Sequence, residues 1–143
     1  MGRAALQLTL DQANKLCDRI ISFARSIGGP YPEMDENYLV WTILSTLGAG
    51  QFVLRMDNKG IRYFANWYRV NAEDLEKVKR LETPSSICGG EFVYIAEVIS
   101  RGEPGDASHM IRRIRNMNKG HKGAFWHQAH RNSRLCTVTE ANK

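Results

Sequence analysis

The spacing of apolar residues near the start of the chain is that of a helix. Between residues 10 and 27, apolar side chains recur at steps of three and four, which predicts an amphipathic helix. Thr9 and Gln12 form a capping-box pattern at its start, and the Gly-Gly-Pro sequence at 28–30 ends it. Residues 35–47 carry apolar side chains on nearly every side and predict a second, well-buried helix.

After residue 50 the spacing changes to that of strands. Residues 51–56 and 61–68 are rich in aromatic and branched side chains, and Asp-Asn-Lys-Gly at 57–60 predicts a hairpin turn between them. Residues 91–100 are apolar on both faces apart from two glutamates, which is typical of a central strand covered on both sides. The other predicted elements are a short helix capped by Asn71, a helix capped by Asp106 or Ser108 that continues to Met117, and a strand at 124–127. This order predicts an α/β fold.

Composition is that of an ordinary soluble globular domain. The chain has 143 residues, of which 43% are hydrophobic and 24% charged. Its longest apolar run is too short to span a bilayer and its first residues lack a signal core, so we expect a cytoplasmic protein. Three widely spaced cysteines favour a reducing compartment. We expect one domain over residues 1–130 and a loosely ordered basic tail over 131–143.

Positive charge is concentrated toward the C-terminal end. The net charge is +5, and the stretch between Asp106 and Glu140 holds seven lysines and arginines and no acidic residue. The basic region, residues 112–134, therefore favours an anionic partner, which is nucleic acid, a phosphate-bearing cofactor or an acidic protein. The alternative is that Phe125 and Trp126 are core strand residues and that the charges form a solvated face.

The strand, loop and helix over residues 91–117 are the most informative unit for function. The glycine-containing loop at 101–105 leads into a helix N-terminus, whose free backbone amides suit a diphosphate. The loop lacks the Lys-Ser/Thr pair of a P-loop and the GxGxxG spacing of a dinucleotide site. The alternative is a plain turn with a helix cap, and the negative charges of Glu103 and Asp106 oppose an anion.

Glu97 is the candidate general base. Strict alternation places it on one strand face with Val93, Ile95 and Ile99, in apolar surroundings that raise the pKa of a carboxyl group toward neutrality. The alternatives are an ion pair with an arginine such as Arg62, or a position near the sheet edge.

Histidines and a cysteine in the second half raise the question of a metal site. They are His109, His121, His127, His130 and Cys136. Their spacing fits no pattern of metal ligands, so we expect surface histidines and no metal.

Two stretches resemble the RTX toxin-activating lysine acyltransferases, the hemolysin-activating branch of the GNAT acyltransferase superfamily. Residues 41–67, WTILSTLGAGQFVLRMDNKGIRYFANW, hold a Gln-aromatic-Val-Leu strand, a turn and an aromatic-rich return strand. Residues 92–115 include Arg-Gly-Glu-Pro-Gly-Asp-Ala, which is close to the superfamily's phosphate loop Gln/Arg-x-x-Gly-x-Gly/Ala with one extra residue. The resemblance covers residues 31–127 and implies a single GNAT-like domain, in which a central mixed sheet has helices on both faces.

The resemblance also implies site residues. Toxin-activating enzymes use a histidine before the second helix and an aspartate on the central strand, where this chain has Tyr31 and Ala96, so that branch's activity is not carried over. Many GNAT enzymes use a central-strand glutamate, which Glu97 supplies, and Tyr31 is a candidate general acid. The residues expected at the cofactor diphosphate are Arg101, Gly102, Gly105, Asp106, Ala107, Ser108, Arg112 and Arg113.

The function predicted in this way is acyl transfer from an acyl thioester, either acyl-CoA or an acyl carrier protein, to an amine on a protein or small molecule. The usual C-terminal strand pair of the superfamily is expected to be short or missing. The alternative is a non-catalytic GNAT-fold binding module, of the kind a phage or accessory element encodes, whose basic region binds nucleic acid or an acidic protein.

Overall fold

The computed structural model describes residues 8–128 and 134–137, and its side chains up to residue 123. The helices are α1 (Leu10–Ile27), α2 (Glu36–Ala49), α3 (Ala72–Lys79) and α4 (Asp106–Met117), with a short 3₁₀ helix, η1 (Tyr31–Glu33), between the first two. The strands are β1 (Phe52–Asp57), β2 (Gly60–Val70), β3 (Phe92–Ser100), β4 (Lys122–Gln128) and β5 (Arg134–Thr137).

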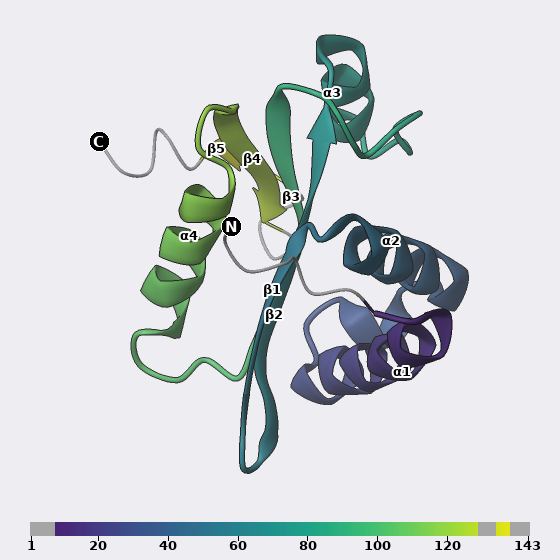
Figure 1. Ribbon diagram of the computed structural model, residues 1–143, viewed down its shortest axis with the longest axis vertical. Coiled ribbons are helices and arrows are strands. Elements are labelled where there is room, and N and C mark those ends of the chain that lie inside the picture. Colours follow the sequence, from purple (N-terminus) through teal and green to yellow (C-terminus); the bar gives the residue numbers. More distant parts are fainter. Residues whose placement is uncertain (1–7, 129–133, 138–143) are drawn as a thin grey trace.

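The five strands form one mixed sheet in the order β1-β2-β3-β4-β5, in which β3 and β4 are parallel and the other neighbours antiparallel. Figure 1 shows α4 on one side of this sheet and α1 and α2 on the other. One core cluster joins α1 and α2 to Phe64 and Ile99, and another joins α4 to Trp67 and Ile95. The predicted α/β fold, with a central mixed sheet covered on both faces, is confirmed.

The helix ends follow local sequence rules at both N-terminal helices. Thr9 and Gln12 satisfy each other's backbone amides in the predicted capping box, and the backbone turns out of α1 at Gly28 with a φ of 95°. The Asp35 carboxylate accepts a hydrogen bond of 3.0 Å from the Tyr38 amide and caps α2. The α4 cap was predicted wrongly: the N-cap is Gly105, in the left-handed region at φ 83°, and not Asp106 or Ser108.

A β-bulge in β3 changes which residues share a face. Asn66 of β2 lies opposite Glu97 and Trp67 lies opposite Ile95, so Ala96 has no partner on β2. The alternation reverses at this extra residue. Ile95 therefore packs with α4, whereas Ile99 packs with α1 and α2. The prediction that Glu97 shares a face with Val93 and Ile95 is wrong, because strict alternation does not survive a bulge.

The sheet continues into the segment expected to be a tail. Four residues of that segment form β5, which pairs with β4 in the register Trp126↔Cys136. Periodicity fades in this part of the sequence and carried no signal for the strand. Residues 1–7, 129–133 and 138–143, which include most of the predicted tail, lie outside the described residues. Among the helices that are described, none is both long and apolar enough to cross a membrane.

Candidate functional site

Strands β3 and β4 are paired only at the start of β3. The parallel register runs from Phe92↔Lys122 to Ile95↔Trp126. Beyond Ile95 the described part of β3 continues for five residues, of which the last four pair with β2 alone, while β4 runs on to Gln128. The carboxyl-terminal half of β3 therefore has an open backbone edge, which is where open α/β sheets bind ligands.

Glu97 lies two residues past the point where the strands separate. Only 6% of the residue is exposed, and the Tyr31 and Tyr38 hydroxyls lie near enough to its carboxyl group to stabilise the charged form. Burial raises its pKa from 4.5 to about 7, although the tyrosine hydrogen bonds act in the opposite direction. The alternative of an ion pair with Arg62 is wrong, because Arg62 is paired elsewhere.

Tyr31 reaches Glu97 from η1, the short turn between α1 and α2. Its hydroxyl donates to the Val98 carbonyl at 3.3 Å, and the residue is 9% exposed. Burial raises the pKa of the Tyr31 hydroxyl well above its usual range, and the neighbouring Glu97 charge raises it further. The structure thus brings together the two residues predicted to be catalytic, from positions 66 residues apart in the sequence.

Sequence reasoning missed the polar side chains that surround this pair. The Tyr38 hydroxyl lies 3.4 Å from that of Tyr68, which in turn lies 2.6 Å from the Thr42 hydroxyl. The Asn66 side-chain oxygen accepts a 2.8 Å hydrogen bond from the Glu97 amide, and its nitrogen donates to Thr46 at 2.9 Å. Polar residues at the centre of apolar elements were the available signal, because a buried polar group needs a partner.

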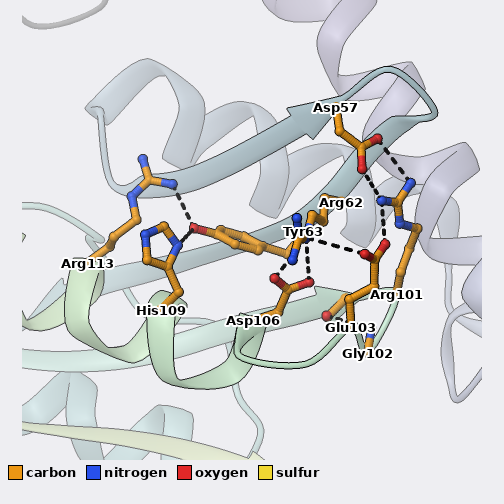
Figure 2. Close-up of polar contacts among 10 residues, drawn as sticks. Asp57, Arg62, Tyr63, Arg101, Gly102, Glu103, Asp106, His109 and Arg113 are labelled. Atoms are coloured by element: carbon orange, nitrogen blue, oxygen red, sulfur yellow. Dashed lines mark hydrogen bonds and ion pairs between the residues drawn. The ribbon is translucent and has the colours of Figure 1, made fainter.

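The loop before α4, the start of α4 and the β1–β2 hairpin together form a cluster of five charged residues, drawn in Figure 2. We call Asp57, Arg62, Arg101, Glu103 and Asp106 the loop ion cluster. Arg101 pairs with Asp57 and Glu103, and the Arg62 Nε lies 2.9 Å from Asp106 and 3.8 Å from Glu103. Asp106 is 1% exposed at the first residue of α4. A carboxylate of the chain itself thus lies at the positive end of this helix.

The predicted diphosphate residues fall into two groups. Arg101 and Asp106 belong to the loop ion cluster, while Arg113 donates to the Leu54 carbonyl at 3.2 Å and to the Tyr63 hydroxyl at 3.0 Å. The Gly102 and Asp106 amides are also used, by Ser100 and by the Glu103 carbonyl. The other group comprises the backbone amides of Ala107 and Ser108 and the exposed guanidinium of Arg112. None of these has an acceptor or an ion-pair partner among the described residues.

Next to this loop, α4 and β2 hold a hydrogen-bonded trio that the sequence did not suggest. Figure 2 shows His109 and Arg113 pointing from α4 toward Tyr63. The Tyr63 hydroxyl lies 2.6 Å from His109 Nδ1 and accepts from Arg113. The three side chains thus hold one another by two hydrogen bonds on the face of β2 that α4 covers.

Within the described residues, no three His, Cys, Asp or Glu side chains are grouped so that they could hold a metal ion. The side chains of His127, His130 and Cys136 lie outside the described part, as do most of those in the second half of the basic region.

Comparisons with solved structures show a distant similarity of fold. The crystal structure of an N-acetyltransferase from Staphylococcus aureus Mu50 superimposes with a TM-score of 0.46 at 9% sequence identity, covering 88% of this chain and 82% of that one. No family model matches the chain, and no curated protein matches it. A similarity of this size assigns neither an activity nor a substrate, and the resemblance to the toxin-activating branch stays a prediction.

Proposed function

We propose that this protein is a GNAT-like N-acyltransferase that moves an acyl group from an acyl thioester, acyl-CoA or an acylated carrier protein, to an amine. The observation that carries the proposal is Glu97. A carboxyl group with a pKa of about 7 lies where a central strand parts from its parallel neighbour. A general base works best when its pKa is near the working pH, and burial supplies that pKa here.

The proposed reaction needs only groups that the chain and the thioester provide. The amine nitrogen attacks the thioester carbonyl carbon, and Glu97 accepts the amine proton directly or through a water molecule. The tetrahedral intermediate collapses with cleavage of the carbon–sulfur bond, and the departing thiolate takes a proton from Tyr31, the candidate general acid. The open edge of β3 offers backbone amides to the carbonyl oxygen, where negative charge develops.

The diphosphate of coenzyme A is proposed to lie at the first turn of α4. The free amides of Ala107 and Ser108 and the guanidinium of Arg112 are available to it. Gly102 and Gly105, at φ 78° and 83°, give the loop its left-handed turns. Arg101 and Arg113 can bind the diphosphate only if they leave their present hydrogen-bond and ion-pair partners. For Arg101, this means that the loop ion cluster has to rearrange.

The first experiment is a thermal-shift titration with coenzyme A and acetyl-coenzyme A at low and high salt. Ligand at about 100 times its dissociation constant stabilises a fold by roughly 2.7 kcal/mol, which is a rise of several degrees for a domain of this size. We expect coenzyme A or acetyl-coenzyme A to raise the melting temperature, and we expect this rise to persist at high salt. No rise with either ligand contradicts coenzyme binding, and acylated carrier protein is then the donor to test.

Glu103→Gln tests the loop directly. Removing this carboxylate takes one ion-pair partner away from both Arg101 and Arg62 and lowers the negative charge beside the phosphates. We therefore expect coenzyme A to bind about threefold to tenfold more tightly. The matched control is Glu82→Gln, which removes a carboxylate paired with Arg80 on the exposed surface. Equal affinities of the two variants would place the diphosphate elsewhere.

Glu97→Gln separates chemistry from binding. Loss of a general base lowers the rate of transfer by about 10²- to 10⁴-fold, while coenzyme affinity is unchanged. The readout is acyl transfer to a panel of amines, measured as free thiol released. A variant that transfers as fast as the parent protein would remove Glu97 from the mechanism.

A second candidate function rests on the exposed surface of α4. Arg112, Arg115 and Lys119 have no hydrogen-bond or ion-pair partner within the part of the chain that the structure describes. Three such cations, two on α4 and one in the turn that follows it, favour a binding module for nucleic acid or an acidic protein. The logarithm of the affinity for nucleic acid would then fall steeply and linearly with the logarithm of the salt concentration. We do not expect such a steep fall for binding of a thioester.

A further inference from the structure

A pocket of about 350 Å³ lies between the C-terminal half of α4 and the start of β4. The residues that line it are Ile95, Ile111, Ile114, Arg115, Asn116, Asn118, Lys119, Gly120, His121 and Gly123. None of these residues took part in the site around Glu97 or in the loop ion cluster. The chemistry of the lining is divided between an apolar floor and a polar, cationic rim.

Three isoleucines form the floor. Ile95 and Ile114 are 5% and 4% exposed and belong to the core cluster under α4, while Ile111 is partly buried against the same cluster. Their branched side chains offer a firm apolar surface to the body of a small molecule.

The rim carries uncompensated positive charge. Neither Arg115 nor Lys119 has a side-chain hydrogen bond or ion pair with any residue that the structure describes, and no acidic residue lines the pocket. This differs from the other end of α4, where Arg62 is paired with Asp106. A free anion therefore meets unoccupied cations at the pocket, whereas at the loop the cations already hold carboxylates.

His121 adds a directional polar group. Its Nδ1 is buried and has no hydrogen-bond partner within the described part of the chain. The turn that presents it is held by the bond from the His121 amide to the Asn118 carbonyl at 3.1 Å. Asn118 is in turn held by Arg69 at 3.0 Å, so the rim is built on fixed neighbours. A buried ring nitrogen without a partner is the kind of group that a ligand satisfies.

We propose that this pocket binds a small organic anion in which an apolar group carries a phosphate or a carboxylate. The apolar group rests on the isoleucine floor, and the anionic group is held by Arg115, Lys119 and His121. The site is separate from the proposed acyl-transfer site, because the bulge at Ala96 turns Ile95 toward α4 and Glu97 toward α2. Arg115 also lies about 12 Å along α4 from Ala107 in the first turn of the helix, since each residue advances a helix by about 1.5 Å.

The test is a titration of isotope-labelled protein, followed by amide chemical shifts. The probes are phenyl phosphate, benzoate, inorganic phosphate and benzyl alcohol. We expect phenyl phosphate or benzoate to shift the amides of Ile111, Gly120 and His121 with saturation, and to bind at least tenfold more tightly than inorganic phosphate or benzyl alcohol. Comparison of the first two probes tells which anionic group the rim prefers. Equal binding of inorganic phosphate, or no saturating shift with either aromatic anion, overturns the proposal.

Charge reversal supplies the matched variants. Arg115→Glu is expected to weaken binding of the preferred aromatic anion at least tenfold. Ile111→Trp, which fills the space above the isoleucines, is expected to weaken its binding as well. Arg55→Glu makes the same change of charge on the exposed part of β1, away from the pocket, and is expected to leave the affinity unchanged. If Arg55→Glu weakens binding of the probe as much as Arg115→Glu does, the net charge of the protein explains the binding and the pocket does not. Because coenzyme binding is measured separately, either proposal can fail alone.

Discussion

Glu97 combines a buried carboxyl group with a short list of neighbours, all of them neutral. The Tyr31 and Tyr38 hydroxyls stabilise the charged carboxylate, and the Asn66 side chain accepts a hydrogen bond from the Glu97 amide. No described cation pairs with the carboxylate, so burial dominates and raises its pKa to about 7. A carboxyl group in this position is uncharged below neutrality and charged above it, which is the property that a proton acceptor at physiological pH requires.

The raised pKa of Glu97 makes a prediction about stability. The folded protein holds this proton up to about pH 7, while an unfolded chain releases it near the ordinary value of 4.5. The free energy of unfolding therefore falls as pH rises through this interval, by on the order of 3 kcal/mol, since one pKa unit corresponds to about 1.4 kcal/mol. In Glu97→Gln this component of the pH dependence should disappear.

The measurement is denaturant unfolding of both proteins from pH 4 to 8. Other groups titrate equally in both, so the difference between the two curves isolates Glu97. Glu73→Gln, at an exposed position on α3, is the control and should follow the parent protein. A difference curve that stays flat across this range would mean that the carboxyl group is hydrated in solution.

At the scale of elements, the β-bulge in β3 decides what the strand presents to each face. It occurs where Asn66 bridges α2 and β3, by donating to Thr46 and accepting from the Glu97 amide. Asn66 is fully buried, so both of these hydrogen bonds are shielded from water. The bulge turns Glu97 toward the helices that carry its tyrosine partners, and strict alternation would have turned it toward α4.

Asn66→Ala should release the bulge. Removing the side chain leaves the Glu97 amide and the Thr46 hydroxyl with one partner fewer, which lowers the free energy of unfolding by about 2 kcal/mol. We also expect the Glu97 amide to exchange its hydrogen faster, while amides of β4 keep their rates. Asn58→Ala, in the exposed hairpin turn, is the comparison and should change neither quantity. Unchanged exchange at Glu97 would show that the backbone of β3 forms the bulge unaided.

At the scale of the whole molecule, one sheet contributes to three core clusters in the described part of the chain, of which the two largest lie under different helices. Strands β2 and β3 contribute Phe64 and Ile99 to the core under α1 and α2, and Trp67 and Ile95 to the core under α4. The proposed acyl-transfer site lies toward the first core and the pocket lies in the second. Since the same two strands carry both cores, neither core can be lost without exposing the other.

We therefore expect one cooperative unfolding transition. Ile43→Ala in the first core and Ile114→Ala in the second should each lower the free energy of unfolding by about 3 kcal/mol, because each leaves a cavity around a buried side chain. Circular dichroism and tryptophan fluorescence should give the same midpoint for each variant. Two separate transitions, with each variant moving only one, would show that the cores unfold independently.

Capping, turn formation and apolar periodicity are local properties, so the sequence predicted the helices, most of the strands and the caps of the first two helices, but not the cap of α4. It also predicted a buried Glu97 and a glycine loop before a helix. The contacts that these residues make depend on the fold. Tyr31 approaches Glu97 from a turn far away in the sequence, and a bulge in β3 sets the face of the sheet on which Glu97 lies. The charges of the loop pair with Asp57 and Arg62 of the β1–β2 hairpin. Periodicity describes neighbours along the chain, whereas a pKa, an ion pair and a pocket depend on groups that are brought together only by folding.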